Sequence, residues 1–482
     1  MNQVPLQADV VVIGSGSAGL VAALTAAEGG AKVIVFEKER SPGGTSNFFE
    51  GTFAVESAMQ REKYITYSRD EAFKNIMEFS HWLANPRLVR AIVNESGATI
   101  GWLQQQGVVF TEATINMPDS PLTYHVVKGK GEAVVKALMT KAKEKGVIVR
   151  LASPVKKIVK QGDRIAGVIA EADGEDIVVR AGAVIIASGG YANNAEWIKK
   201  YTGFDLNVNL VPVGNVDKMG DGIRMAWELG AAEAGKSLLE FYRVGPIAPE
   251  FAMAGEIEWA VVQPDLWVDP KGVRFCDEAV AFFDSSVGNV AAKYKEGYTY
   301  SIFNDAAVQR MLTRGIDKNV VIGVPPGSKP GDFYRNINTA LDRGTSEIFA
   351  AETVEELAGK MGVDPAVLKA TVDEYNAFCD KRHDDLFAKD PKYLYAIRSP
   401  KYYAVKARTV FLGTMGGIKI NEKTEVVDKK DAVIPGLYAT GFDAGGMYGD
   451  TYSIKGASGL SSAFAMNSGR LAGKNALKFI GK

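Results

Sequence analysis

The sequence predicts an α/β fold made of a nucleotide-binding domain and an inserted α+β domain. Three observations support this prediction: a β-α-β unit with a glycine-rich turn near the N-terminus, a shift to aromatic-rich irregular segments near residue 235, and a return to strand-like segments after about residue 395. A chain of 482 residues is too long for one ordinary core and suits two domains. We therefore expect residues 1–237 and 396–482 to form the nucleotide-binding domain and residues 238–395 to form the insertion.

Composition and charge exclude several classes of protein. Hydrophobic residues make up 46% and charged residues 23%, as in globular proteins, and the net charge of −1 gives no electrostatic footprint for nucleic acid or an anionic membrane. The 51 glycines are about 11% of the chain against a usual ~7%, while the 18 prolines are not raised to match, which indicates tight turns and close approaches of backbone to a ligand.

Cysteine and histidine are too scarce for most metal chemistry. Cys276 and Cys379 cannot build a disulfide framework, and three histidines make a multi-histidine centre improbable, so we expect no metal. The N-terminus has no basic and apolar signal pattern, and no apolar run reaches the ~20 residues of a spanning helix. The sequence therefore predicts a cytoplasmic protein without membrane insertion.

The first forty residues form the β-α-β pattern of a nucleotide-binding unit. Residues 9–13 read as a buried parallel strand, residues 20–28 as a helix of small residues, and residues 32–37 as a second strand that ends on an acid. Between the first strand and the helix lies the turn 14–19, Gly-Ser-Gly-Ser-Ala-Gly. The complete unit is much more specific than the glycine pattern alone.

Each glycine of this turn has a separate expected role. Gly14 permits the tight turn, Gly16 lets a phosphate approach the backbone, and Gly19 lets the helix pack closely on the strand. Glu37, at the end of the second strand, is placed to accept both hydroxyls of a ribose. These four residues predict a bound dinucleotide.

A second glycine-rich turn follows the acid and favours a flavin over a nicotinamide cofactor. It covers residues 41–46, Ser-Pro-Gly-Gly-Thr-Ser, where a nicotinamide enzyme would normally continue with further strand-helix units. A longer cofactor needs a second loop to hold its far half. The alternative is an ordinary surface turn.

Later segments complete the expected topology. Short strands over residues 147–190 end in Ala183-Val-Ile-Ile-Ala-Ser-Gly-Gly190, which returns the chain to the sheet beside the cofactor. We expect helices over residues 86–106, 132–145 and 223–229, helix starts at Thr353 and at Asp364-Pro365, a strand over residues 417–420 and a closing helix from about residue 458.

Several further motifs accompany the β-α-β unit. They are Gly43-Gly44-Thr-Ser46, Ala187-Ser-Gly-Gly190, Met219-Gly-Asp-Gly222, Gly272-Val-Arg-Phe-Cys-Asp-Glu278, Tyr375-Asn376, Thr414-Met-Gly-Gly417 and Ile434-Pro-Gly-Leu-Tyr-Ala-Thr-Gly441. With these motifs the chain resembles, over almost its full length, the flavoprotein superfamily of fumarate reductase, succinate dehydrogenase, urocanate reductase and 3-ketosteroid dehydrogenases.

The resemblance implies FAD bound by a Rossmann-like domain under a mobile capping domain, with hydride passing between flavin N5 and one carbon of a C–C bond. FAD is expected to be non-covalent, because no histidine replaces Thr45 to form the family's covalent link. The residues implied in FAD binding are Gly14, Gly16, Ala18, Gly19, Glu37, Lys38, Gly43, Gly44, Thr45, Ser46, Val155, Ala187, Ser188, Gly189, Asp221, Gly441, Asp443, Ser458, Gly459 and Leu460.

Four departures from the family pattern bear on the substrate. The dicarboxylate reductases of the family bind two carboxylates with histidines and arginines, and the corresponding positions here are Gly245, Phe283, Gly413 and Tyr452. None of the four carries a permanent charge, and an unpaired carboxylate in a desolvated pocket costs several kcal/mol. This pattern argues against fumarate or succinate as the substrate.

The loop around Tyr452 resembles the active-site loop of the 3-ketosteroid dehydrogenases. In those enzymes a tyrosine and the glycine four residues later, here Tyr452 and Gly456, share the ketone oxygen of the substrate. A phenol O–H and a backbone N–H that converge on one oxygen form an oxyanion hole for an enolate. The alternative is that Tyr452 is a packed aromatic residue beside the flavin.

The side chain that exchanges the α-proton, the proton on the carbon next to the carbonyl, is not assigned. The base tyrosine of the steroid enzymes aligns with Phe282, and Phe283 replaces the family's arginine. The remaining candidates are Tyr124, Tyr242, Arg243 and Tyr448.

Three functions remain open. The first is an FAD-dependent desaturase or ene-reductase that acts on the C–C bond next to a carbonyl. The second is a reductase of an unsaturated carboxylate, with Arg243 or Lys455 as an unfamiliar clamp. The third is a flavoprotein subunit that passes electrons to or from a partner. In each case a small-molecule substrate or a separate electron donor or acceptor is expected, since no second dinucleotide motif is present.

Overall fold

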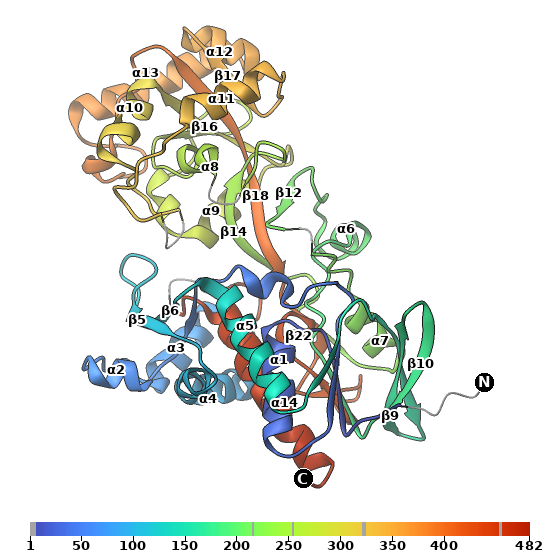
Figure 1. The fold of residues 1–482 in the computed structure, drawn as a ribbon. Coiled ribbons are helices and arrows are strands. Elements are labelled where there is room, and N and C mark those ends of the chain that lie inside the picture. Colours follow the sequence, from blue (N-terminus) through green and yellow to red (C-terminus); the bar gives the residue numbers. More distant parts are fainter. Residues whose placement is uncertain (1–5, 215, 253–254, 321–323, 453–455) are drawn as a thin grey trace. The chain divides into compact units, whose positions relative to one another are not determined.

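The computed structural model describes residues 6–214, 216–252, 255–320, 324–452 and 456–482 (Figure 1). The chain divides into two compact units, each built from segments that are distant in the sequence. Unit 1 comprises Met1–Gly203, Gly214–Glu240 and Gly413–Lys482, and unit 2 comprises Phe204–Val213 and Phe241–Leu412. None of the described helices is long and apolar enough to cross a membrane.

Strand pairing explains why unit 2 extends beyond the segment 238–395 that composition suggests. The long strand β18 (Tyr402–Thr414) pairs with β16 (Thr299–Asn304) through its first half. Its second half pairs in parallel with β12 (Leu210–Pro212). Backbone hydrogen bonds therefore tie residues on both sides of the expected insertion into the same sheet.

The central sheet of unit 1 has six strands in the order β20-β21-β11-β2-β3-β7. Their bounds are Glu425–Val427, Val433–Ala439, Ala183–Ile186, Val10–Ile13, Val33–Phe36 and Ile148–Arg150. All neighbours pair in parallel except β20 and β21 at one edge. β2, β3 and β11 are buried over their whole length, which explains their unbroken apolar sequences.

Helices of small residues pack on this sheet. α1 (Ser17–Glu28) lies beside α14 (Leu460–Phe479) and α5 (Lys130–Glu144) (Figure 1). Gly469 of α14 shows why this packing is close, since a Cβ atom there would lie 2.4 Å from the carbonyl oxygen of Ala18. The closing helix begins at Leu460, two residues after the expected start.

Three smaller sheets and further helices complete the described part of unit 1. The sheets are β1-β10-β9-β8 (Leu6–Gln7, Glu175–Arg180, Arg164–Ala172, Val155–Gln161), β4-β6-β5 (Gly51–Phe53, Tyr124–Val127, Phe110–Thr114) and β13-β19-β22 (Glu233–Ala234, Gly417–Lys419, Ala444–Gly445). The helices are η1 (Gly44–Asn47), α2 (Ala58–Glu62), α3 (Arg69–Phe79), α4 (Pro86–Gln105), α6 (Ala195–Thr202), α7 (Asp221–Glu228) and η4 (Gly441–Asp443).

Unit 2 is an α+β unit organised around β18. β14 (Leu239–Gly245) and β17 (Ile348–Ala351) also pair with β18, and β15 (Leu266–Val268) pairs with β16. Its helices are α8 (Glu256–Val261), η2 (Glu278–Phe282), α9 (Asp284–Ala292), α10 (Asp305–Arg314), α11 (Phe333–Asp342), α12 (Val354–Met361), α13 (Pro365–Lys381) and η3 (Pro391–Tyr393).

Helix starts in unit 2 follow the local sequence signals. The Thr353 side chain accepts a hydrogen bond from the N–H of Glu356 at the start of α12. Asp364 caps α13 in the same way, with Pro365 at the first helical position. The sequence Thr353-Val-Glu-Glu356 also predicts a capping box, in which Glu356 would accept from the N–H of Thr353; instead Glu356 accepts from the N–H of Glu352, so the box is only half formed.

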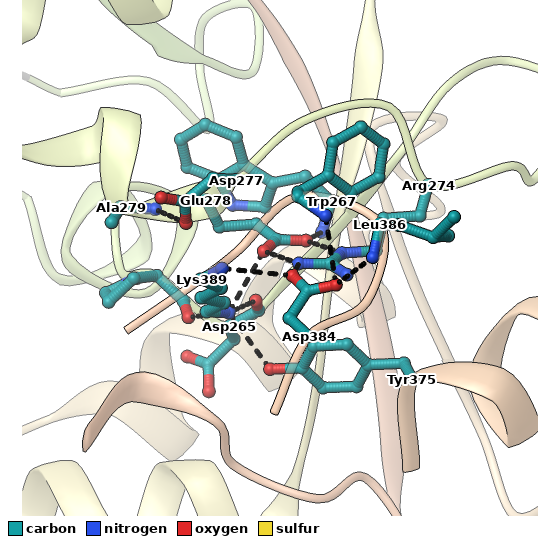
Figure 2. A network of polar contacts seen from close by, with 12 residues as sticks. Asp265, Trp267, Arg274, Asp277, Glu278, Ala279, Tyr375, Asp384, Leu386 and Lys389 are labelled. Atoms are coloured by element: carbon teal, nitrogen blue, oxygen red, sulfur yellow. Dashed lines mark hydrogen bonds and ion pairs between the residues drawn. The ribbon is translucent and has the colours of Figure 1, made fainter. Parts of the chain in front are cut away.

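The Arg-Phe-Cys-Asp-Glu motif forms a buried ionic network in unit 2 (Figure 2). Arg274 donates to both carboxylate oxygens of Glu278, at 2.8 and 2.9 Å, and to Asp384 at 2.7 Å. The ammonium group of Lys389 lies 3.0 Å from Glu278 and donates to the hydroxyl of Tyr375, also at 3.0 Å. These contacts give the motif a structural role, since they fix the segment after β15 to α13 and the loop that follows it.

Candidate dinucleotide site and buried tyrosine cluster

Four loops of the candidate site follow four neighbouring parallel strands. The turn 14–19 follows β2, Glu37 follows β3, residues 187–189 follow β11, and η4 follows β21 by one residue. Because the carboxyl ends of parallel strands meet at one edge of a sheet, these loops gather at the same edge of unit 1. All the residues that the sequence predicts for FAD binding lie in unit 1.

The turn 14–19 has no room for side chains at two of its glycines. Gly14 has φ of +104°, and a Cβ atom there would lie 2.3 Å from the carbonyl oxygen of Ala187. A Cβ atom on Gly19 would lie 2.0 Å from the carbonyl oxygen of Gly14. Gly16 is the N-cap of α1 and supplies no side chain to cap the helix, so its N-terminus favours an anion apart from the N–H of Ser17, which donates to Ser46.

The second glycine-rich turn is bonded to the first. The hydroxyl of Ser46 accepts from the N–H of Ser17 at 2.9 Å, and the N–H of Gly43 donates to the hydroxyl of Ser15 at 3.3 Å. Gly43 has φ of +103° and precedes η1, which contains Gly44 and Thr45. The turn is therefore part of the candidate site rather than an isolated surface turn.

Glu37 and Lys38 both have partners within the protein. The carboxylate of Glu37 accepts from the N–H and the hydroxyl of Ser15, at 2.9 and 2.6 Å. This pairing fixes the acid next to the turn 14–19. Lys38 forms ion pairs with Asp217 at 2.8 Å and with Asp221 at 3.0 Å, so two of the predicted FAD-binding residues contact each other.

Asp443 connects the loop after β11 with η4, the short helix after β21. Its carboxylate accepts from the N–H groups of Gly189 and Gly190 and from the hydroxyl of Ser188, each at 3.0 Å. Burial raises the pKa of this carboxyl group. The hydrogen bonds hold the loop after β11 against η4, which begins at Gly441.

The remaining predicted FAD-binding residues are buried in unit 1 or lie at the start of α14. Val155 begins β8 and is buried, as are Ala18, Ala187 and Ser458. Gly459 is the N-cap of α14, with φ of +78°, and Leu460 is the first residue of that helix. A Cβ atom on Gly459 would lie 2.9 Å from the N atom of Phe53, so position 459 has no room for a side chain either.

These features fit a dinucleotide with a diphosphate. The N-terminus of α1 without a side-chain cap, and Gly14 and Gly19 without room for side chains, suit the close approach of a diphosphate. The acid after β3 is an acceptor that suits a ribose. With FAD, the residues of the turn 14–19 would hold the diphosphate and Glu37 would face the ribose. When bound, FAD supplies a group that accepts or gives a hydride.

Tyr452 lies in a buried cluster at the N-terminus of α14. Its hydroxyl is 3.4 Å from both the N atom and the Oγ atom of Ser461, and its ring packs edge-on against that of Tyr448, with centroids 5.7 Å apart. Burial and the neighbouring Glu240 raise the pKa of Tyr452, so this hydroxyl keeps its proton and acts as a donor.

Two charged residues of this cluster escaped the sequence analysis. Glu240, in β14, is 1% exposed and interacts with the side chains of Ser461 and Tyr452. Lys218 is 4% exposed, and its ammonium group lies 5.8 Å from the ring centroid of Phe442. A carboxylate in the otherwise apolar sequence Leu-Glu-Phe-Tyr was the signal that could have revealed Glu240.

The structure does not bring every predicted substrate residue together. Gly456 is buried, and a Cβ atom there would lie 1.6 Å from Oδ1 of Asn75; its N–H is not among the groups that contact the Tyr452 hydroxyl. Lys455 lies outside the described residues. Among the candidates for the α-proton, Tyr448 packs against Tyr452, whereas Arg243 forms a buried ion pair with Glu258 at 3.2 Å.

Aromatic rings fill the space beside two of the four replaced clamp positions. A Cβ atom on Gly413 would lie 2.8 Å from the ring of Phe442 in unit 1, and one on Gly245 would lie 2.8 Å from the ring of Phe251 in unit 2. Phe283 precedes α9, and Phe282 packs against Tyr393 with ring centroids 5.0 Å apart. Neither glycine position has room for a histidine without movement of an aromatic ring.

Comparisons with known proteins place the chain in a family. The FAD binding domain family matches residues 9–458. The chain is 35% identical over 480 residues to a vinyl phenol reductase of Lactiplantibacillus plantarum, covering 98% of this chain and 96% of the relative. It is 28% identical over 484 residues to a cytochrome-type fumarate reductase of Shewanella frigidimarina, covering 98% of this chain and 77% of that one.

Solved structures show the same fold. A 3-ketosteroid Δ1-dehydrogenase from Sterolibacterium denitrificans, in complex with 1,4-androstadiene-3,17-dione, has a TM-score of 0.79 at 18% identity, covering 98% of this chain and 99% of that one. An open conformation of a flavocytochrome c3 fumarate reductase has a TM-score of 0.75 at 24% identity, covering 99% and 79%.

The fold and the site define a flavoprotein with a Rossmann-like FAD-binding unit. This chain belongs to the FAD binding domain family, and it is an FAD-dependent oxidoreductase. The sequence-based predictions of the fold, of FAD and of this enzyme class are confirmed.

Proposed function

We propose that this enzyme reduces, or forms in the reverse direction, a C=C bond conjugated with a neutral oxygen function such as a ketone. The observation that carries the proposal is the Tyr452 hydroxyl, which is buried, protonated and accepts a hydrogen bond of 3.4 Å from the N–H of Ser461 in the first turn of α14. A phenol donor at a helix N-terminus favours an oxygen on which negative charge develops during reaction.

Three residues of the cluster have a task in this reaction. When bound, FAD would supply or accept the hydride at one carbon of the bond, and the conjugated oxygen would carry the charge that develops. The Tyr452 hydroxyl donates to that oxygen and binds the enolate-like transition state more tightly than the ketone. The α14 N-terminus orients this hydroxyl through Ser461, and Tyr448 packs against its ring.

A vinyl phenol is a second candidate substrate, favoured by the 35% identity to the vinyl phenol reductase across nearly the whole of both chains. Its phenolic oxygen is also neutral, and the Tyr452 hydroxyl would hydrogen-bond to it. A hydride added to this C=C bond leaves charge on carbon rather than on that oxygen, so Tyr452 would orient a vinyl phenol instead of stabilising an enolate.

An unsaturated carboxylate and a pure electron-transfer role are the alternatives. The fumarate reductase relative supports the first, but the Arg243 side chain is already paired with Glu258. Activity of the isolated chain with an artificial electron donor distinguishes an enzyme that works alone from a subunit that needs a partner. We expect a separate physiological electron donor or acceptor in either case.

Turnover with reduced methyl viologen tests the proposal. We expect cyclohex-2-enone or 4-vinylphenol to be reduced and fumarate to be a poor substrate. Efficient reduction of fumarate, with neither neutral substrate consumed, would refute it.

We also propose that FAD is bound non-covalently, so acid precipitation should release it into the supernatant. Flavin that stays with the protein pellet would contradict non-covalent binding.

The capping role of the inserted segment is a further part of the proposal. Closure of a lid over bound substrate excludes water from a reaction of this kind. Limited proteolysis should cut the borders of the segment 238–395 more slowly when a ligand is bound. Identical cutting patterns with and without a proven ligand would contradict the closure.

A further inference from the structure

The carboxyl group of Glu240 is buried, and one of its oxygen atoms lacks a hydrogen-bond partner among the described residues. This oxygen is Oε2, and the side chain otherwise interacts with the side chains of Ser461 and Tyr452. A buried carboxyl oxygen without a partner is costly, and such groups are retained where they serve a purpose other than stability. The hydroxyl of Tyr448, also buried, shares this lack of a partner among the described residues.

The ionisable groups that face Glu240 come from two loops. Lys218 lies in the loop before α7, and Tyr448 and Tyr452 lie in the loop before α14. Burial raises the pKa of Glu240 to about 7, and burial lowers the pKa of Lys218 to about 8. The pKa of Tyr452 is raised far above neutral pH, so this residue cannot remain ionised after it gives up a proton.

We propose, on the basis of the proposed function, that Glu240 supplies, during reduction, the proton that Tyr452 gives to the substrate oxygen, and accepts that proton in the reverse reaction. The inference rests on the contact between the two side chains, on their burial and on the free second carboxyl oxygen. Glu240 is a positioning and proton-supplying residue in this scheme, because it acts through Tyr452 and not on the substrate itself.

The proton transfer balances in the direction of reduction. As a hydride reaches the β-carbon of an enone, its electron pair becomes the new C–H bond and the π electrons shift to the carbonyl oxygen. The Tyr452 O–H bond breaks and an O–H bond to the substrate forms, while the proton of Glu240 moves to the Tyr452 oxygen. The products are an enol, which rearranges to the ketone by moving its O–H proton to the α-carbon, and a Glu240 carboxylate, whose charge the Lys218 ammonium offsets. Glu240 then regains a proton from water before the next turnover.

The variant Glu240→Gln tests the relay, because glutamine keeps the shape of the side chain but cannot act as an acid. The wild-type kcat for cyclohex-2-enone should fall above a pH near 7, where Glu240 loses its proton. The variant should lose this inflection, and its kcat at pH 6 should fall about 100-fold while KM changes little. Glu28→Gln is the matched control, since the Glu28 carboxylate accepts from Trp102 and Gln106 elsewhere in unit 1.

A spectroscopic measurement separates the relay from a structural role. The infrared band of a protonated carboxyl group should disappear as the pH of wild-type protein rises through 7, and it should be absent from Glu240→Gln protein that still binds FAD. In a double-mutant cycle, Glu240→Gln should reduce kcat by less than threefold once Tyr452 is phenylalanine, because the relay is already broken.

The possible failures can be told apart. A wild-type enzyme that reduces neither neutral substrate refutes the proposed function, and the relay with it. An active wild-type enzyme whose kcat and pH profile are unchanged by Glu240→Gln refutes the relay alone. Full additivity in the double-mutant cycle would also overturn it.

Discussion

Arg274 and Glu278 form a bidentate ion pair in the interior of unit 2, with hydrogen bonds of 2.8 and 2.9 Å. Asp384 accepts a third hydrogen bond from the guanidinium group, and Lys389 contacts Glu278 from the other side (Figure 2). Two cations thus balance two anions at a place that water does not reach. Removing one partner would leave an uncompensated buried charge.

The variant Lys389→Met should therefore destabilise the protein strongly. We expect a loss of about 3–5 kcal/mol in the free energy of unfolding, measured by urea denaturation. Lys392→Met is the control, because Lys392 is exposed and paired with Asp390 on the surface, so its removal should leave stability unchanged. Equal denaturation midpoints for the two variants would show that the network contributes little.

Gly19→Ala should disturb the cofactor site. The added Cβ atom would lie 2.0 Å from the carbonyl oxygen of Gly14, which is backbone and cannot turn away. We expect a loss of about 1–3 kcal/mol in stability and weaker retention of FAD, followed by thermal unfolding and by flavin absorbance. Gly101→Ala in α4 meets no atom within 4 Å and should be neutral or stabilising by up to about 1 kcal/mol. Equal flavin content in both variants would contradict the close packing at Gly19.

Tyr452→Phe should impair chemistry without affecting cofactor binding. It removes one hydrogen-bond donor and keeps the ring that packs on Tyr448, so kcat should fall by about 10²–10³ while KM changes little. Tyr438→Phe is the matched control, because the Tyr438 hydroxyl, 3.2 Å from the carbonyl oxygen of Asn475, is bonded in a buried part of unit 1 away from the cluster. Near-normal turnover of the Tyr452 variant would mean that this residue only packs.

His125 should make the protein sensitive to acid. Burial lowers its pKa to about 4, and its ring nitrogens contact the Ser57 hydroxyl at 2.7 Å and the Thr123 carbonyl at 3.1 Å. The unfolded chain takes up a proton on this imidazole below about pH 6.5, whereas the folded protein does so only near pH 4. The free energy of unfolding should therefore fall as pH drops from about 6.5 to 4.

The variant His125→Gln should show a smaller fall, by up to about 3 kcal/mol, in urea denaturation at pH 7 and pH 4.5. Glu240 contributes in the opposite direction over part of this range, since its raised pKa favours the folded protein at lower pH. That contribution is the same in both proteins and cancels in the comparison. Parallel dependence on pH in the two proteins would contradict the assignment to His125.

The sequence predicted the nucleotide-binding part well because its determinants are local. Within forty residues, apolar runs specify β2 and β3, small residues specify α1, and the glycines at 14 and 19 stand where the backbone leaves no space for a side chain. Helix starts at Thr353 and Asp364 followed in the same way from side chains that cap the nearest N–H groups.

The tertiary structure alone decided which distant groups meet. Asp443 binds the N–H groups of Gly189 and Gly190 across more than 250 residues of chain, and the pairing of β12 with β18 set a boundary that composition placed elsewhere. Glu240 had no motif of its own, yet burial against Tyr452 changes its proton affinity. A local pattern can specify a strand, a turn or a cap, but the pKa and the partners of a buried group depend on what the rest of the chain packs around it.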